Sequence, residues 1–203
     1  MRTLRYTLVA DGSSDAALKA VIEWTVRTHR PDLGVLGEMA GSLGGVGLAL
    51  GARIPRALEL FPCDLLIVHR DAEGDSLEHR LSEIEVAVGG MFSPWVPVIP
   101  VRMTEAWLLS DEAAIRSAAE NKAGRVELHL PARSRWEQLR DPKEILFEAL
   151  RTASEKSPRA LRKFNPARQR ALVADRTQDF SRLRGLNSFD LFETKMAEAI
   201  RNF

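Results

Sequence analysis

Apolar and polar positions follow a pattern that predicts alternating strands and helices in the first half of the chain. Four apolar runs are typical of strands and lie at residues 5–11, 33–39, 64–69 and 95–101. Between them, apolar residues recur at helical spacing, which predicts helices near residues 18–29, 50–61 and 77–88. Parallel neighbours need crossover helices of this length, so the order predicts a doubly wound, mainly parallel α/β sheet.

Two of these strands have positions in the sheet that their composition predicts. The run Asp64 to His69 is continuously apolar between polar ends, as expected of a central parallel strand that is buried on both faces. The last run, residues 95–101, contains Pro97 and Pro100. Prolines cannot donate ladder hydrogen bonds, so this segment is expected at or near a sheet edge.

The chain after Thr104 is expected to be mostly helical. Asp141 precedes a proline and a capping-box glutamate, and Asn165 and Asn187 are expected to start later helices in a similar way. Residues 1–109 are therefore predicted to form the α/β core, and residues 110–203 a mostly helical C-terminal extension packed on it.

Composition and charge indicate where the protein is located and what it binds. The chain has 203 residues, 45% hydrophobic and 28% charged, and it contains no apolar run long enough to span a membrane. Its single cysteine, Cys63, has no disulfide partner, which indicates the cytoplasm. Residues 151–203 carry 12 Lys and Arg against 6 Asp and Glu. This basic part is expected either to bind nucleic acid or to form solvated helical faces.

Carboxylates gather where the predicted strands end. In open parallel sheets, ligands bind beyond the carboxyl ends of the strands, so these positions are candidates for a site. The first run is followed by Asp11 and Asp15, the third by Asp71, Glu73 and Asp75, and the fourth by Glu105. Turns, helix caps and a favourable helix dipole are alternative explanations for single members.

A divalent cation is the ligand that such a set predicts. Mg²⁺ (or Mn²⁺) prefers oxygen ligands, and a bound metal orients a phosphate and activates water. In an extended segment Asp71 and Glu73 point the same way, and Asp75 joins them as a third metal ligand. Arg70 and Arg102 are candidates for contact with a substrate phosphate.

The acidic motifs resemble a known fold family. Asp11-Gly-Ser-Ser-Asp15 followed by Asp71-Ala-Glu73 is similar to the Toprim fold of topoisomerases, primases and OLD-type nucleases. The phrases at residues 69–73 and 100–109 look like the Toprim-like domain-of-unknown-function family 4276. Asp11 stands where Toprim proteins usually have glutamate, and Glu73 where they usually have aspartate.

The resemblance implies a chemistry and a partner. By it, Asp71 and Glu73 bind Mg²⁺, while Asp11 acts as a general acid/base or metal-linked group. Members of the family often accompany an ATPase, including in phage-defence loci. Asp15 and Glu105 complete the set of residues for which we expect catalytic roles.

Two functions of different classes follow from these residues. The first is a Mg²⁺-dependent, nuclease-like enzyme of phosphodiester chemistry, and the second is a non-catalytic regulatory or binding subunit that docks a partner ATPase. A phosphorylated receiver-like domain is disfavoured by the long helical region and by the lack of a clear strand-five lysine. The sequence also lacks a P-loop, a G-x-S-x-G motif and clustered Cys and His, which disfavours a P-loop ATPase, a serine hydrolase and a zinc site.

Overall fold

A four-stranded parallel sheet forms the centre of the protein. The computed structural model describes residues 2–41, 43–92 and 94–203. The strands are β1 (Thr3–Val9), β2 (Gly34–Met39), β3 (Leu65–His69) and β4 (Trp95–Val98), in the order β2-β1-β3-β4. All three pairings are parallel, with Val9 opposite Val68 and His69 opposite Val98. The predicted doubly wound α/β fold is confirmed.

The strand positions follow from their composition. Every residue of β3 is buried, as its continuous apolar run predicts for a strand with a neighbour on each side. The segment containing Pro97 forms β4 at one edge of the sheet, where a missing donor is tolerated. At the other edge, β2 alternates between half-buried and exposed residues near its end.

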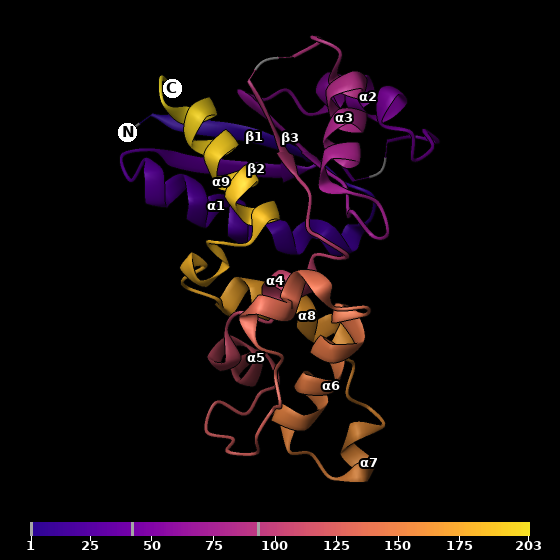
Figure 1. The fold of residues 1–203 in the computed structure, drawn as a ribbon, viewed down its shortest axis with the longest axis vertical. Helices are drawn as coiled ribbons and strands as arrows, with labels where there is room; N and C mark the ends of the chain where they lie inside the picture. Colours follow the sequence, from indigo (N-terminus) through magenta and orange to yellow (C-terminus); the bar gives the residue numbers. More distant parts are fainter. Residues whose placement is uncertain (1, 42, 93) are drawn as a thin grey trace.

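Helices cover both faces of the sheet (Figure 1). Leu65 and Ile67 pack in one apolar cluster with α1 (Leu18–His29) and α9 (Asn187–Ile200). Leu66 and Val68 pack in a second cluster with α2 (Leu50–Leu60) and α3 (Leu77–Val88). Successive side chains of a strand point to opposite faces, so the two clusters are the two sides of the sheet.

The C-terminal half forms a helical layer beside the carboxyl ends of the strands and then returns to the sheet (Figure 1). Its elements before α9 are α4 (Glu105–Leu108), α5 (Glu112–Ala118), η2 (Arg133–Gln138), α6 (Pro142–Ser154), α7 (Pro158–Leu161), α8 (Pro166–Arg176) and η3 (Ser181–Leu183). Helix α9 then packs against β4 and α1. One continuous apolar cluster therefore joins the sheet to the helical extension.

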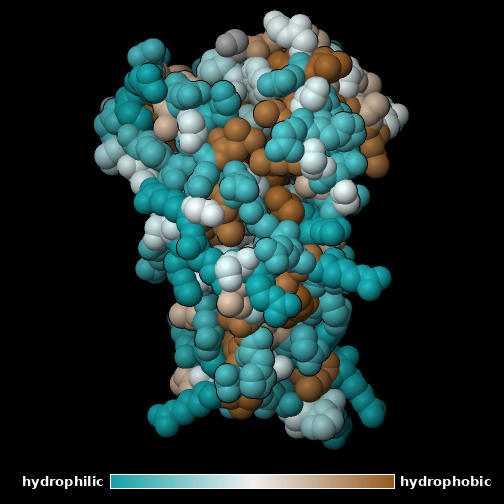
Figure 2. All heavy atoms as spheres, in the orientation of Figure 1, coloured by the Kyte–Doolittle hydropathy of each residue, from teal (hydrophilic) through white to brown (hydrophobic). Residues whose placement is uncertain are grey.

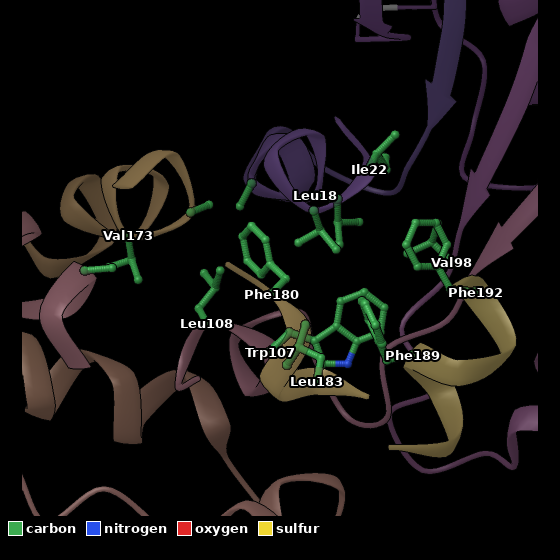
Figure 3. Packing of buried hydrophobic residues seen from close by; sticks show 14 of the residues in the cluster. Leu18, Ile22, Val98, Trp107, Leu108, Val173, Phe180, Leu183, Phe189 and Phe192 are labelled. Atoms are coloured by element: carbon green, nitrogen blue, oxygen red, sulfur yellow. The ribbon is translucent and has the colours of Figure 1, made fainter. Parts of the chain in front are cut away.

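Aromatic side chains from distant segments hold this junction together (Figure 3). Trp107 of α4 lies edge-on to Phe189 of α9, with ring centroids 5.5 Å apart, and Phe192 lies beside both. Each aromatic pair adds roughly 0.5–1.5 kcal/mol beyond the area it buries. The apolar side chains of Leu18 and Ile22 in α1 complete the cluster.

Two of the three predicted N-cap residues cap their helices, and the third does not. Asp141 accepts a hydrogen bond from the Glu144 amide, and Asn165 accepts one from the Arg168 amide, as expected of N-caps. Helix α9 begins at Asn187 as predicted, but that side chain does not cap it. Instead, Glu137 of η2 accepts hydrogen bonds from the amides of Asn187 and Ser188.

Hydrophilic residues cover most of the molecular face that Figure 2 shows. Exposed large apolar residues include Leu48, in the segment before α2, and Val86, on α3. In residues 2–41, 43–92 and 94–203, no helix combines the length and the apolar character that a membrane crossing requires.

Candidate functional site

Acidic and basic side chains meet where β1 and β3 end. These strands are neighbours, with Val9 opposite Val68, so the segments that follow them leave the same edge of the sheet. Asp11 follows β1, and Arg70 and Asp71 follow β3. The candidate site consists of Asp11, Asp15, His69, Arg70 and Asp71.

His69 lies between two of the carboxylates. Its side chain is 1% exposed, and its Nε2 atom is 3.2 Å from Asp71 Oδ1 while its Nδ1 atom is 3.6 Å from Asp15 Oδ2. Burial alone lowers the pKa of this histidine. The hydrogen bond to Asp71 and the negative charges of Asp71, Asp15 and Asp11 outweigh burial and raise the pKa above its usual value. The contact with His69 holds the Asp71 carboxylate in place.

Arg70 fixes Asp11 at the mouth of the site. The Arg70 guanidinium forms an ion pair with Asp11, lies 3.2 Å from Glu83 Oε1 and donates to the Leu48 carbonyl at 2.8 Å. Arg70 is 13% exposed and Asp11 36% exposed, so Asp11 is the partner that reaches solvent.

The pKa of the Asp11 carboxyl group is raised above its usual value. Burial raises its pKa, as do the nearby charges of Asp15 and Asp71, and these effects outweigh the lowering by Arg70 and His69. Asp15 and Asp71 lie on either side of His69, and Asp11 pairs with the adjacent Arg70. Asp11 thus combines partial exposure with an increased tendency to hold a proton.

Asp15 has two structural partners besides His69. Its Oδ2 atom accepts the Gly12 amide at 2.9 Å, and its Oδ1 atom accepts the Ser14 hydroxyl at 3.2 Å. This arrangement closes the start of η1 (Ser13–Ala17), as a capping box does. The cap and the contact with His69 are thus made by the same carboxylate, which is almost fully buried.

Glu73 and Asp75 lie in a turn and not in an extended segment. The Asp75 amide donates to the Ala72 carbonyl, and Glu73 has a left-handed φ of 53°. The alternation that would point Asp71 and Glu73 the same way therefore does not apply, because the chain turns into α3 immediately after Ala72. Both Glu73 and Asp75 are exposed, and Asp75 lies 2.9 Å from Arg80.

Glu105 is turned into the interface between α4 and α8. Its side chain is 5% exposed and forms an ion pair with Arg170, which is 15% exposed. The structure shows no contact between Glu105 and the carboxylates of the candidate site among the described residues. Arg102 has a left-handed φ of 70° and is exposed.

The carboxylates are the kind of donor that Mg²⁺ prefers, but they do not form a ready-made cage. Among residues 2–41, 43–92 and 94–203, no group of three or more His, Cys, Asp or Glu side chains is arranged to hold a metal. Asp11 and Asp71 each keep an oxygen atom outside the contacts described above. Mg²⁺ usually keeps several waters and needs only one or two carboxylates, so this donor set fits the ion.

Five basic residues of the C-terminal part lie close together in the sequence, at positions 159, 162, 163, 168 and 170. Four of them are exposed on α7, on α8 and between these helices: Arg159, Arg162, Lys163 and Arg168. The fifth, Arg170, is turned inward to Glu105. These elements belong to the helical layer and not to the sheet (Figure 1). The basic surface is therefore built on a different part of the fold from the acidic site.

Arg53 is a buried residue near the site that the sequence analysis overlooked. Arg53 is 7% exposed, and its guanidinium donates a hydrogen bond to the Ala10 carbonyl at 2.6 Å. Ala10 immediately precedes Asp11 in the chain. A signal for it exists in the sequence. Position 53 lies three residues after Leu50 and four before Ala57, so a charged residue occupies the apolar face of a predicted helix.

Comparison with family models, with curated proteins and with solved structures yields no match to this chain.

Proposed function

We propose that the protein carries out divalent-metal-dependent phosphodiester chemistry, of the nuclease type, at the carboxyl ends of β1 and β3. The observation that supports this most strongly is that Asp11 and Asp71 follow neighbouring parallel strands, with Arg70 paired to Asp11 at that edge of the sheet. Carboxylates attract a hard cation, and a guanidinium matches the oxygen atoms of a phosphate. The Toprim-like motifs that contain Asp11 and Asp71 are consistent with the same chemistry.

Asp71 would hold Mg²⁺ or Mn²⁺, with waters filling the other coordination positions. The bound ion would supply charge neutralisation at a phosphate and a water molecule of lowered pKa. His69 serves as a positioning residue, because it is buried and hydrogen-bonded to Asp71 and does not reach solvent. Replacing it would loosen Asp71 without removing a ligand.

Asp11 is suited to move a proton. A carboxyl group with a raised pKa holds a proton closer to neutral pH than a free aspartic acid does, which is what a general acid or base requires. It is also the most exposed member of its ion pair with Arg70. Arg70 keeps the carboxyl group oriented, and its positive charge offsets part of the negative charge that would repel a phosphate.

A cleavage assay tests the proposal. Purified protein is incubated with single-stranded and double-stranded DNA and RNA, with Mg²⁺, Mn²⁺ or EDTA. We expect cleavage that requires the metal and is lost in Asp71→Asn, which keeps the size of the side chain and removes its charge. Asp175→Asn is the matched control, because Asp175 is exposed on α8 in the helical layer.

A binding subunit that docks a partner ATPase is the second candidate function. The ion pairs of Asp11 with Arg70 and of Glu105 with Arg170 favour it, because each gives a predicted catalytic carboxylate a structural partner. Intact nucleic acid in every metal condition, with no difference between wild type and Asp71→Asn, would favour this second function over the first.

A further inference from the structure

A pocket of about 370 Å³ opens beside Asp11, between the carboxyl ends of β1 and β2. Its size falls within the range of small-ligand pockets. Its lining includes Asp11, Gly12, Ser13, Met39, Gly41 and Arg53. The neighbouring Ala10, Ala16 and Ala40 make the remaining wall apolar.

Arg53 is the feature of this pocket that calls for a ligand. The residue is 93% buried, and its guanidinium makes one hydrogen bond within the part of the chain that the structure describes, to the Ala10 carbonyl. Among residues 2–41, 43–92 and 94–203, its Nε atom is buried without a hydrogen-bond partner, and Arg53 forms no ion pair. A guanidinium has five N–H donors and stays charged, and buried charges in proteins are normally paired.

We propose that Arg53 and the pocket around it form a phosphate subsite next to Asp11. A guanidinium binds oxyanions through two parallel hydrogen bonds. The choice of phosphate over other oxyanions rests on the proposed phosphodiester chemistry. Asp11 lines this pocket and also belongs to the acidic site. The subsite holds a phosphate of the substrate while the bond to be broken lies toward Asp71.

Two glycines, Gly12 and Gly41, belong to the lining of the pocket. A Cβ atom at Gly12 would meet only the Ser14 hydroxyl, at 3.6 Å, and one at Gly41 would meet only the Met39 carbonyl, at 4.0 Å. A Cβ atom at either position would make only an ordinary van der Waals contact.

Binding is measured without metal, so that it reports on the subsite and not on the cation. Inorganic phosphate and a nucleoside 5′-monophosphate are titrated in EDTA buffer by calorimetry and by thermal shift. The variants are Arg53→Met, which keeps the length of the side chain, and Arg53→Lys, which keeps the charge. Arg56→Met is the matched control, because Arg56 lies on the same helix, is 39% exposed and pairs with Glu59 at the surface.

We expect Arg53→Met to weaken binding by about 10- to 100-fold, the effect of losing a charged hydrogen-bonded contact. Arg53→Lys should bind with intermediate affinity, because a lysine keeps the charge without the bidentate geometry. Arg56→Met should bind as the wild type does. The melting temperature of ligand-free Arg53→Met should equal or exceed that of the wild type, because the variant removes a buried, incompletely paired charge.

The opposite results overturn the subsite. These are no binding of either ligand by the wild type, equal binding by Arg53→Met, or an equal loss in Arg56→Met. If Arg53→Met does not fold, Arg53→Lys decides the question. An affinity of Arg53→Lys equal to that of the wild type would show that Arg53 makes no bidentate contact with the ligand. Asp71→Asn should bind phosphate in EDTA as the wild type does. If the wild type cleaves no nucleic acid but Arg53→Met still weakens phosphate binding, the proposed function is refuted and the subsite stands.

Discussion

The buried ion pair between Glu105 and Arg170 gives the sharpest prediction about stability. It joins α4 to α8, and the two side chains are 5% and 15% exposed. Removing one partner of such a pair leaves an uncompensated charge in a poorly solvated place, which costs about 3–5 kcal/mol. Natural domains have a total stability of about 5–15 kcal/mol, so this loss would be large.

The two single variants should differ. Arg170→Met leaves the Glu105 carboxylate, the more buried group, without a partner, so we expect the larger loss, about 3 kcal/mol or more. Glu105→Leu leaves Arg170, whose long side chain is already partly exposed and reaches water more easily. We expect that variant to lose less, about 1–3 kcal/mol.

The double variant Glu105→Leu/Arg170→Met should recover most of the loss. Replacing both partners by apolar side chains removes the desolvation cost together with the attraction, and such exchanges are often neutral. The expected stability is within about 1 kcal/mol of the wild type, which gives a coupling energy of about 3 kcal/mol or more. The surface pair Arg56–Glu59, 39% and 66% exposed, should show a coupling below about 1 kcal/mol under the same substitutions.

Urea denaturation followed by tryptophan fluorescence measures these energies, because Trp107 lies in α4 beside Glu105. The comparison requires equal m-values among the variants. Single variants that each cost less than about 1 kcal/mol, or losses that simply add in the double variant, would refute the buried-pair argument. A stable double variant that has lost metal-dependent cleavage would instead return Glu105 to the catalytic role that the sequence predicts.

Three further predictions address the metal, the packing of α9 and the basic surface. Mg²⁺ should raise the melting temperature of the wild type by mass action, and Asp71→Asn should remove most of that rise in a fluorimetric melt; an unchanged rise excludes Asp71 as a ligand. Glu193 pairs with Arg184 and His29. Burial raises the pKa of Glu193, but these partners lower it below its usual value. The contribution of Glu193 to the free energy of unfolding is therefore present above the unfolded pKa and is lost as pH falls through the folded pKa. Glu193→Gln should therefore cost about 1 kcal/mol in urea at neutral pH and less below about pH 4, and an equal cost at both would contradict the pairing. Nucleic-acid binding should weaken as the salt concentration rises. In a filter-binding titration, the triple variant Arg162→Glu/Lys163→Glu/Arg168→Glu should show a smaller slope of log affinity against log salt concentration, by about one for each lost phosphate contact. Equal retention of wild type and variant at two salt concentrations would remove nucleic acid as the partner of this surface.

Local sequence patterns were sufficient to predict the sheet and most of its helices. Strand β3 is a continuous apolar run, the proline-containing segment of β4 lies at an edge, and Asp141 and Asn165 cap the helices that follow them. These features depend on residues close together in the chain, where periodicity and capping act directly. The position of Asp11 and Asp71 at the same edge of the sheet also follows from the parallel topology.

The partners of the charged side chains were decided by the tertiary structure alone. Glu105 and Arg170 are 65 residues apart in the chain, and Arg53 lies 43 residues from the Ala10 carbonyl that it contacts. A carboxylate at a strand end has the same local sequence whether it faces a metal, a guanidinium or solvent. Only the docking of α8 on α4, and of α2 on the sheet, determines which of these surrounds it, because desolvation and pairing depend on groups that the local sequence does not contain.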